Sequence, residues 1–206
     1  MNREIGRIGS AVTGACVAAF AVCMLAGLRF GSYFVCMPLA LGYMMMAAAL
    51  YAECAPERRA AGALGLAMAG VYAVLVLLVY FAQTTTVNLE PLTGDAQRLL
   101  DYSRMSLMFN YDLLGYGMMA LSTFFAGLAM VPADKGDRAL RTLMMVHGVF
   151  FLSCFIMPML GLFSSADGST SGGGVLALEA WCAYFLPIAA LGWRHFGPGR
   201  EGKTAK

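Results

Sequence analysis

Six long apolar segments dominate this 206-residue chain, and each is long enough to cross a lipid bilayer as an α-helix. A helix needs about 20 mainly apolar residues to span a hydrocarbon core of ~30 Å. The segments are apolar all round, whereas helices on the surface of a soluble domain keep a polar face. We predict an all-α fold: a polytopic membrane protein whose single domain, 1–206, is a bundle of six transmembrane helices. The predicted spans are 10–28, 33–52, 61–82, 105–131, 140–163 and 174–196.

The positive charges predict the orientation of the bundle, because cytoplasmic loops of membrane proteins carry an excess of Lys and Arg. Eleven of the fourteen Lys and Arg residues lie in the N-terminal tail, around the second-to-third and fourth-to-fifth connections, and in the C-terminal tail. The others are Arg29, Arg98 and Arg104. Both termini are therefore predicted to be cytoplasmic, which agrees with an even number of spans. The net charge of +2 indicates contact with anionic lipid headgroups and not with nucleic acid.

The segment 83–104, between the third and fourth spans, is predicted to lie outside the membrane. Asp95 is a candidate N-cap, because its side chain can accept hydrogen bonds from the free N–H groups of a following turn. A short amphipathic helix is predicted over 96–103, lying on the outer face. The loop 164–174 is rich in Gly and Ser and is predicted to be mobile, and 197–206 is predicted to be a frayed cytoplasmic tail.

Polar side chains inside the apolar spans are the candidates for function, because lipid penalises them. Under the predicted orientation four of them lie in the outer third of the membrane: Gln83, Asn110, Asp112 and Glu179. They predict an outward-facing pocket for a small-molecule ligand, with Tyr111, Tyr116 and Trp181 as its walls. An alternative is that Asp112 and Glu179 reach water at headgroup depth by snorkelling. A second alternative is that the two carboxylates form a general acid–base pair.

His147 is the histidine placed deepest in a span, about two turns into the fifth. Its functional interpretation is proton transfer or metal binding, since an imidazole changes charge near neutral pH. The alternative is a hydrogen bond to a neighbouring helix. His195, at the end of the sixth span, is predicted to be interfacial.

No metal or cofactor is predicted from the sulfur-containing residues. The six cysteines lie within or at the ends of spans and form no CxxC motif, so neither a redox enzyme nor a zinc site is indicated. Sixteen methionines raise the option of copper(I), which thioethers favour. Consecutive methionines such as Met44, Met45 and Met46 point to different faces of one helix, however, and methionine is ordinary filler in apolar cores.

A stripe of small residues on the third predicted span indicates close helix packing. Small residues let neighbouring helices approach in lipid, where packing replaces the hydrophobic effect as the driving force. The stripe predicts that this span lies at the centre of the bundle. Alternatively, it docks another membrane protein or a second copy of the chain. Its members recur every four residues: Ala61, Gly65, Ala69 and Ala73.

Three stretches carry a resemblance to a known family: 79–87 (VYFAQTTTV), 92–94 (LTG) and 113–122 (LLGYGMMALS). They resemble a family of small bacterial six-span integral membrane proteins of unknown function. The resemblance covers about a third of the chain directly. It implies the six-span architecture and a location in the bacterial plasma (inner) membrane, and it brings no activity, cofactor or catalytic residue.

The favoured function is therefore small-molecule binding or transport through the outward-facing pocket. Three alternatives remain at this stage. In the first, the chain is an accessory subunit that docks a membrane protein through its third span. In the second, it is a membrane enzyme acting on a lipid-like substrate. In the third, it is a sensor whose segment 84–103 binds a ligand.

Overall fold

The computed structural model describes residues 1–161 and 172–198, and the chain is all-α over this part. It contains six helical segments long and apolar enough to cross a membrane, which confirms the predicted number of spans and a multi-pass membrane protein. The predicted loop 164–174 and tail 197–206 lie largely outside the described residues. The spans are formed by α1 (Asn2–Leu25), α2 (Arg29–Ala52), α3 (Arg59–Thr84), α6 (Leu107–Ala129), α7 (Lys135–His147) with α8 (Phe150–Met159), and α9 (Gly172–His195).

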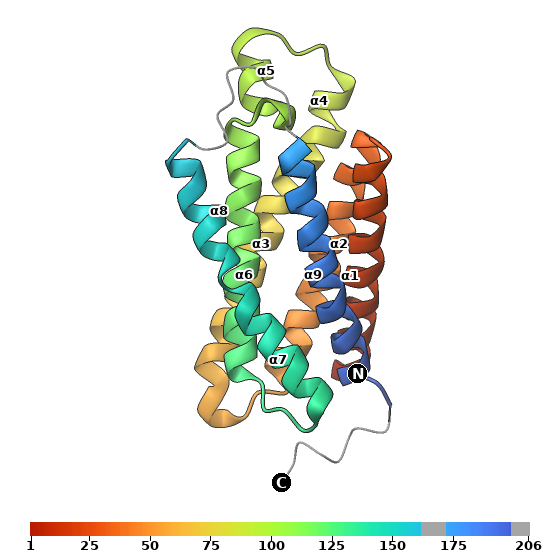
Figure 1. The fold of residues 1–206 in the computed structure, drawn as a ribbon, viewed down its shortest axis with the longest axis vertical. Helices are drawn as coiled ribbons and strands as arrows, with labels where there is room; N and C mark the ends of the chain where they lie inside the picture. The colour runs from red at the N-terminus through yellow and green to blue at the C-terminus, as the bar shows by residue number, and fades with distance from the viewer. Residues whose placement is uncertain (162–171, 199–206) are drawn as a thin grey trace.

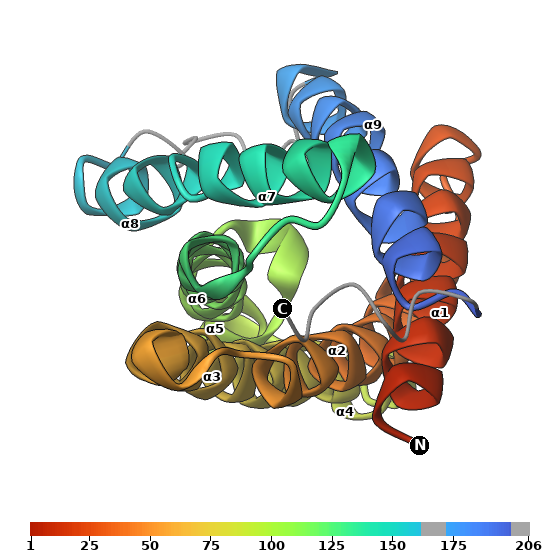
Figure 2. The ribbon, with the colours of Figure 1, turned by 90° about the horizontal axis from the view of Figure 1, so that it is seen from below.

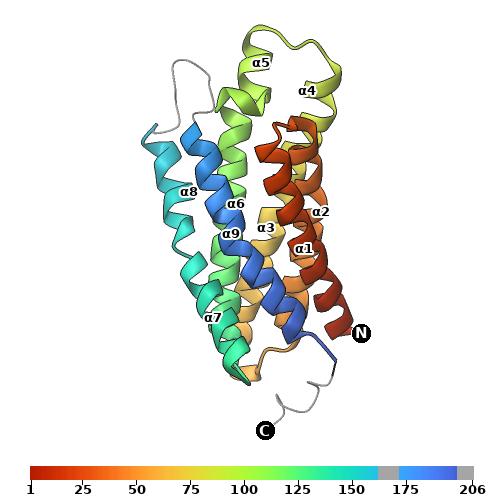
Figure 3. The ribbon, with the colours of Figure 1, turned by 45° about the vertical axis from the view of Figure 1, so that its right-hand side comes forward.

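The helices begin and end at two opposite ends of an elongated bundle. At one end α1 begins and α9 ends, and we call it the terminal end (Figure 1). The opposite end, here the α5 end, carries α4 (Thr86–Leu89), α5 (Gly94–Leu100) and the 3₁₀ turn η2 (Tyr102–Arg104) (Figure 3). A second 3₁₀ turn, η1 (Pro56–Arg58), precedes α3 at the terminal end.

Each long helix packs on its neighbours in the chain, and α9 closes the bundle against α1. Seen along the helix axes, α1, α2 and α3 form one row, and α6 lies between α3 and the pair α7 and α8 (Figure 2). The ends of α8 and α9 at the α5 end are splayed apart (Figure 1). Residues of both helices line a cavity.

The first and fifth spans begin earlier than predicted. Span one begins at Asn2 rather than at residue 10, and span five begins at Lys135 rather than at residue 140. The first turns of α1 are polar in sequence, yet Gly6 is packed so tightly that a Cβ there would lie 2.7 Å from the Cβ of Ala49 and from the ring of Phe196. This contact with α2 and the end of α9 holds the polar start of α1 in helical form.

Span five is interrupted between α7 and α8. Gly148 and Val149 keep right-handed helical torsions but make hydrogen bonds to the third residue back rather than the fourth. A Cβ at Gly148 would lie 2.7 Å from the Cβ of Phe124 on α6. Glycine at this position thus allows α6 and the break in span five to approach closely.

The segment between α3 and α6 differs from its prediction. The helix spans Gly94–Leu100 instead of 96–103, and its N-cap residue is Thr93, so the prediction of Asp95 as N-cap is wrong. Asp95 lies inside the first turn and pairs with Arg98 at 3.7 Å. The positive φ of Gly94, +58°, starts the helix one residue before Asp95, since glycine adopts this torsion at little cost.

The small-residue stripe of α3 packs against another helix of the same chain. Gly65, Ala69 and Ala73 are buried, and Ala61 is half-buried. A Cβ at Gly65 would lie 3.1 Å from backbone atoms of Ser122 and Ala126 on α6. The Ser122 hydroxyl also donates a 2.6 Å hydrogen bond to the Gly65 carbonyl. The stripe around Gly65 is therefore covered by α6 and not exposed to a partner.

Candidate functional site

Asp112 is the buried acidic residue at the centre of the candidate site. It lies near the start of α6, and 3% of its surface is exposed. Its Oδ2 atom accepts hydrogen bonds from the hydroxyls of Tyr80 on α3 and Tyr102 on η2, each 3.0 Å long. Its Oδ1 atom is buried and has no hydrogen-bond partner among the described residues. The carboxylate is thus satisfied on one oxygen only, although buried polar atoms are nearly always paired.

Three tyrosines from three different elements pack beside this carboxylate. The ring centroid of Tyr33 on α2 lies 5.6 Å from that of Tyr80 and 5.5 Å from that of Tyr102. Burial, followed by the charge of the neighbouring Asp112 carboxylate, raises the pKa of Tyr102 well above its ordinary value. Tyr102 therefore keeps its proton and remains a hydrogen-bond donor to Asp112.

A cavity of about 260 Å³ adjoins Asp112, and we call it the Asp112 cavity. Residues of α3, α6, α8 and α9 line it, together with Phe20 of α1 and Tyr102. Among the described side chains that line it, Asp112 is the one with a formal charge. An apolar cavity with few, well-placed polar groups is the usual form of a small-molecule site. The aromatic residues of its wall include Tyr80, Tyr102, Phe109, Tyr116, Phe150 and Trp181.

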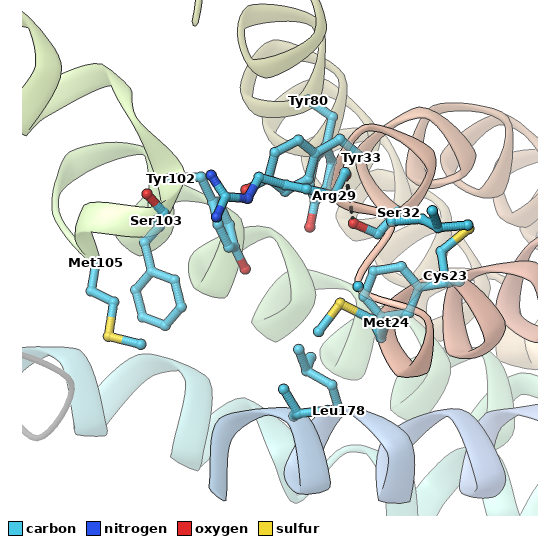
Figure 4. A pocket seen from close by; sticks show the side chains of 15 residues that line it. Cys23, Met24, Arg29, Ser32, Tyr33, Tyr80, Tyr102, Ser103, Met105 and Leu178 are labelled. Carbon is cyan, nitrogen blue, oxygen red and sulfur yellow. Dashed lines mark hydrogen bonds between the residues drawn. The ribbon is translucent and has the colours of Figure 1, made fainter. Parts of the chain in front are cut away.

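A second cavity of about 250 Å³ lies beside the first, and five residues line both: Phe20, Tyr80, Tyr102, Phe109 and Leu178. Figure 4 shows Tyr80 and Tyr102 together with Arg29 and Tyr33 on one side of this second cavity, and Leu178 across from them. Arg29 lines the second cavity but not the Asp112 cavity. The two cavities are thus neighbours with part of their walls in common, and the charged side chain of their described lining is Arg29 in one and Asp112 in the other.

Gln83 ties the end of α3 to the segment that carries Tyr102. Its Nε2 atom donates to the carbonyl oxygen of Leu100 at 2.8 Å, and its Oε1 atom accepts from the backbone N–H of Tyr102 at 2.9 Å. Gln83 is buried but does not line the Asp112 cavity. Its contacts position Tyr102, and with it one of the two hydroxyls that bind Asp112.

Replacing Gln83 by Leu should loosen the segment around Tyr102 without unfolding the bundle. The backbone amide of Tyr102 is expected to exchange with deuterium roughly thirtyfold faster, because each of the two lost hydrogen bonds contributes about 1 kcal/mol. Hydrogen–deuterium exchange measured on the peptide containing this amide tests the prediction. Asn88→Leu, at an exposed position of α4, serves as the control. Unchanged protection of Tyr102 in Gln83→Leu would contradict the positioning role.

The other predicted pocket residues are divided between the cavity and its surroundings. Tyr116 and Trp181 line the Asp112 cavity, with their ring centroids 5.2 Å apart at a steep angle. Asn110 and Tyr111 are exposed and do not line it. Asn110 and Asp112 are two residues apart, about 200° around the helix, and so cannot share a face.

Glu179 is half-buried on α9, and its Oε1 atom is buried without a hydrogen-bond partner among the described residues. It does not line the Asp112 cavity, whereas its neighbours Leu178 and Trp181 do. The reason is again the helical phase, since Glu179 and Trp181 are about 200° apart around α9. Asp112 and Glu179 are therefore not brought together on one cavity wall.

Sequence reasoning missed the tyrosines that bind and surround Asp112. Tyr80 lies three residues before Gln83, on the same face of a helix, and this spacing was a usable signal. Tyr102 lies on a 3₁₀ turn, where no helical period relates it to Asp112. Its place depends on the Asp101 side chain, which accepts from the N–H of Ser103 at 2.9 Å, and on Gln83.

His147 has both ring nitrogens occupied within the chain. Trp181 donates from Nε1 to Nε2 of His147 at 3.1 Å, so this ring nitrogen must be an acceptor. Nδ1 lies 2.8 Å from the hydroxyl oxygen of Thr123, whose own proton goes to the carbonyl of Ala120. These partners assign the proton of a neutral imidazole to Nδ1. The contacts are those of a side chain that joins α6, α7 and α9.

His195 is buried against other parts of the chain at the terminal end, with 5% of its surface exposed. Its interfacial depth in the membrane stays a prediction. Its Nδ1 lies 2.9 Å from a carboxylate oxygen of Asp137 on α7, and its Nε2 lies 2.9 Å from one of Glu53 after α2. Glu53 also pairs with Arg3 of α1 at 2.7 Å, and Arg3 donates to the carbonyl of His195. We call these four residues the terminal clamp, because they join four helices that are distant in sequence.

Over residues 1–161 and 172–198, no three or more His, Cys, Asp or Glu side chains are grouped so that they could hold a metal ion. No protein-family model, no curated protein and no solved structure matches the chain. The sequence resemblance to small six-span membrane proteins therefore brings no family assignment.

Proposed function

We propose that this protein binds a small molecule in the Asp112 cavity and acts as a membrane-embedded binding protein or carrier. The observation that supports this proposal is the Oδ1 atom of Asp112, which is buried and unpaired beside a cavity rich in aromatic rings. An acidic side chain within a span costs roughly 2–3 kcal/mol even on the insertion scale. Such a cost is retained where the group meets a ligand or a partner, and the described part of the chain supplies no cation to it.

The orientation proposed for this function follows from the positive-inside rule. The terminal end would be cytoplasmic, and the α5 end with the two cavities would face the outside. The resemblance noted in the sequence favours the plasma membrane of a bacterium. A ligand would then reach the cavity from the outer side, beneath the segment that carries α5 and Tyr102.

Two other functions receive less support from the geometry. Docking of a partner through α3 was based on the small-residue stripe, and Gly65 in this stripe is packed against α6. Catalysis on a lipid-like substrate would need an acid–base set within hydrogen-bond reach. Within the described residues, the side chains that donate hydrogen bonds to Asp112 are the tyrosines Tyr80 and Tyr102, and both nitrogens of His147 bind other partners.

The proposed function is tested by thermal unfolding of the purified protein against a panel of small amines, carboxylates and neutral amphiphiles. A compound of the panel should raise the melting temperature of the wild type, and Asp112→Asn should abolish the shift. The substitution is suited to the test because the amide oxygen of Asn still accepts from Tyr80 and Tyr102 while the charge is removed. Asn110→Ala is the matched control on α6, because Asn110 is exposed.

The control variant should keep the full ligand-dependent shift of the wild type. An Asp112→Asn protein that folds and retains an unchanged shift would contradict binding at Asp112. A panel in which no compound shifts the wild type would count against the binding function itself.

A further inference from the structure

We infer that the Asp112 cavity selects an organic cation, a ligand whose ammonium group lies between the Asp112 carboxylate and the surrounding aromatic rings. This inference rests on the proposed function and narrows its ligand to one chemical class. Three observations carry it: the charge of the wall, the buried oxygen of Asp112 that has no hydrogen-bond partner among the described residues, and the aromatic rings of the wall.

The wall of the cavity has a carboxylate and no counter-charge. None of the described residues that line it is Lys, Arg or His. Arg29 lines the neighbouring cavity and does not line this one. The hydroxyls of these tyrosines donate hydrogen bonds to Asp112 but carry no positive charge. A cation in the cavity would supply the missing charge, and a protonated amine would also supply the missing donor to Oδ1.

The rings of the wall are arranged to bind such a cation. A cation is attracted to the face of an aromatic ring, most strongly to that of Trp, and aromatic cages are the usual sites for quaternary ammonium groups. Trp181 and Tyr116 stand nearly perpendicular to each other, with an interplanar angle of 81°. Both rings line the cavity, and Trp181 is stacked on Phe185 at a centroid distance of 5.2 Å.

Both rings are held in place by hydrogen bonds that do not involve a ligand. Trp181 donates from Nε1 to His147, and the Tyr116 hydroxyl lies 3.7 Å from the sulfur of Cys36. A pre-organised site loses little conformational entropy on binding. These contacts also give His147 a specific task, because it orients the Trp181 indole from behind.

The volume limits the size of the ligand. A cavity of about 260 Å³ has room for roughly eight small groups, taking about 30 Å³ for each, the share of a water molecule in the liquid. This is the size of a small amine or quaternary ammonium compound, or of the headgroup of a larger amphiphile. A free cation and a lipid headgroup share the ammonium chemistry.

Cys154 provides a direct test, because it lines the cavity on α8. A variant that retains Cys154 as its only cysteine, with Cys36→Ser so that Tyr116 keeps a hydrogen-bonding neighbour, is treated with three methanethiosulfonates. Their reactive sulfur carries a trimethylammonioethyl, hydroxyethyl or sulfonatoethyl group. In each reaction the thiolate attacks this sulfur, a disulfide forms and methanesulfinate leaves. Rates are divided by those for a small free thiol, so that only the effect of the protein remains. Cys154→Ser in the same background defines unspecific labelling.

The cationic reagent should modify Cys154 on the order of tenfold faster than the anionic one, because a carboxylate attracts a cation strongly in a cavity of low dielectric constant. Asp112→Asn should remove this preference, whereas Asp95→Asn, at an exposed position of the same end, should keep it. In the protein that retains Asp112, tetramethylammonium should compete for the cavity and slow the reaction of the neutral reagent with Cys154. If phosphatidylethanolamine in mixed micelles slows this reaction and tetramethylammonium does not, the ligand is a lipid headgroup.

The outcomes separate the two proposals. Equal normalised rates for all three reagents would overturn the selection of a cation and leave an accessible cavity. Failure of every reagent to modify Cys154 would overturn the proposed function as well, since the cavity would then be closed to small molecules.

Discussion

Replacing His195 by Ala is expected to lower the free energy of unfolding by about 3 kcal/mol or more, because it removes the ring that lies between the buried carboxylate of Asp137 and the half-buried carboxylate of Glu53. Both ring nitrogens of His195 face carboxylate oxygens at 2.9 Å, one on Glu53 and one on Asp137. Ionised carboxylates only accept hydrogen bonds, so both nitrogens donate and the ring is the cation of the terminal clamp. Asp137 is itself buried, with 2% of its surface exposed.

The effect should extend over several helices, because the terminal clamp joins elements from both ends of the chain. Arg3 of α1 pairs with Glu53 and donates to the carbonyl of His195 at the end of α9. Asp137 in turn accepts from the N–H of Ala133 at 3.1 Å, in the connection between α6 and α7. Loss of the imidazole thus removes the group that links α2, α7 and α9.

The melting temperature of the detergent-solubilised protein, followed by intrinsic fluorescence, measures this effect. Arg194→Ala is the matched control at the adjacent position, since Arg194 is half-exposed and pairs with Asp134 at 3.2 Å on the surface. Exposed pairs contribute about 1 kcal/mol or less. Asp137→Asn combined with His195→Ala should cost less than the sum of the single changes, because the two groups interact. Equal losses in His195→Ala and Arg194→Ala would refute the terminal clamp.

Gly9→Leu is expected to be the most damaging change on α1, with a loss of about 3 kcal/mol or a failure to form a monodisperse protein. A Cβ at Gly9 would lie 2.6 Å from the carbonyl oxygen of Gly42 and from the backbone nitrogen of Met46. These are backbone atoms of α2, so no side chain can turn aside. The two helices would have to separate, and helix association in lipid depends on such close packing.

Gly70→Leu on α3 is the control for this change. A Cβ at Gly70 would meet no atom within 4 Å, so the substitution tests the gain of side chain and the loss of glycine in a helix without the clash. Size-exclusion chromatography and thermal unfolding should show a wild-type-like protein for Gly70→Leu and a destabilised one for Gly9→Leu. Similar melting temperatures for the two variants would mean that α1 and α2 do not approach as closely as described.

The membrane-spanning architecture could be predicted because it depends on local properties. Length and continuous apolar character suffice to mark a segment as a span, whatever its neighbours are. The predictions that were wrong concern the ends of helices, where contacts with neighbouring residues determine at which residue a helix begins. The start of α1 is polar, and it stays helical because Gly6 packs on Ala49 and Phe196. Asp95 was a reasonable N-cap by residue type, but Gly94 began the helix before it.

The candidate site could be predicted only in part, and the reason is helical phase. Asp112, Tyr116 and Trp181 were chosen because they are polar or aromatic within apolar spans, and they line one cavity. Asn110 and Glu179 were chosen by the same criterion and lie on other faces. The depth of a residue in the membrane follows from its place in the span, whereas its direction depends on how each helix is rotated in the bundle.

The sequence by itself determined that this chain has six segments able to cross a membrane as helices, because length and apolar character are properties that each segment has on its own. The tertiary structure decided which polar groups meet. Asp112 receives Tyr80 from another helix and Tyr102 from a 3₁₀ turn, and His195 receives Glu53 and Asp137 from elements far away in the chain. These pairings depend on the rotation and spacing of packed helices, which are set by contacts such as that of Gly9 with α2.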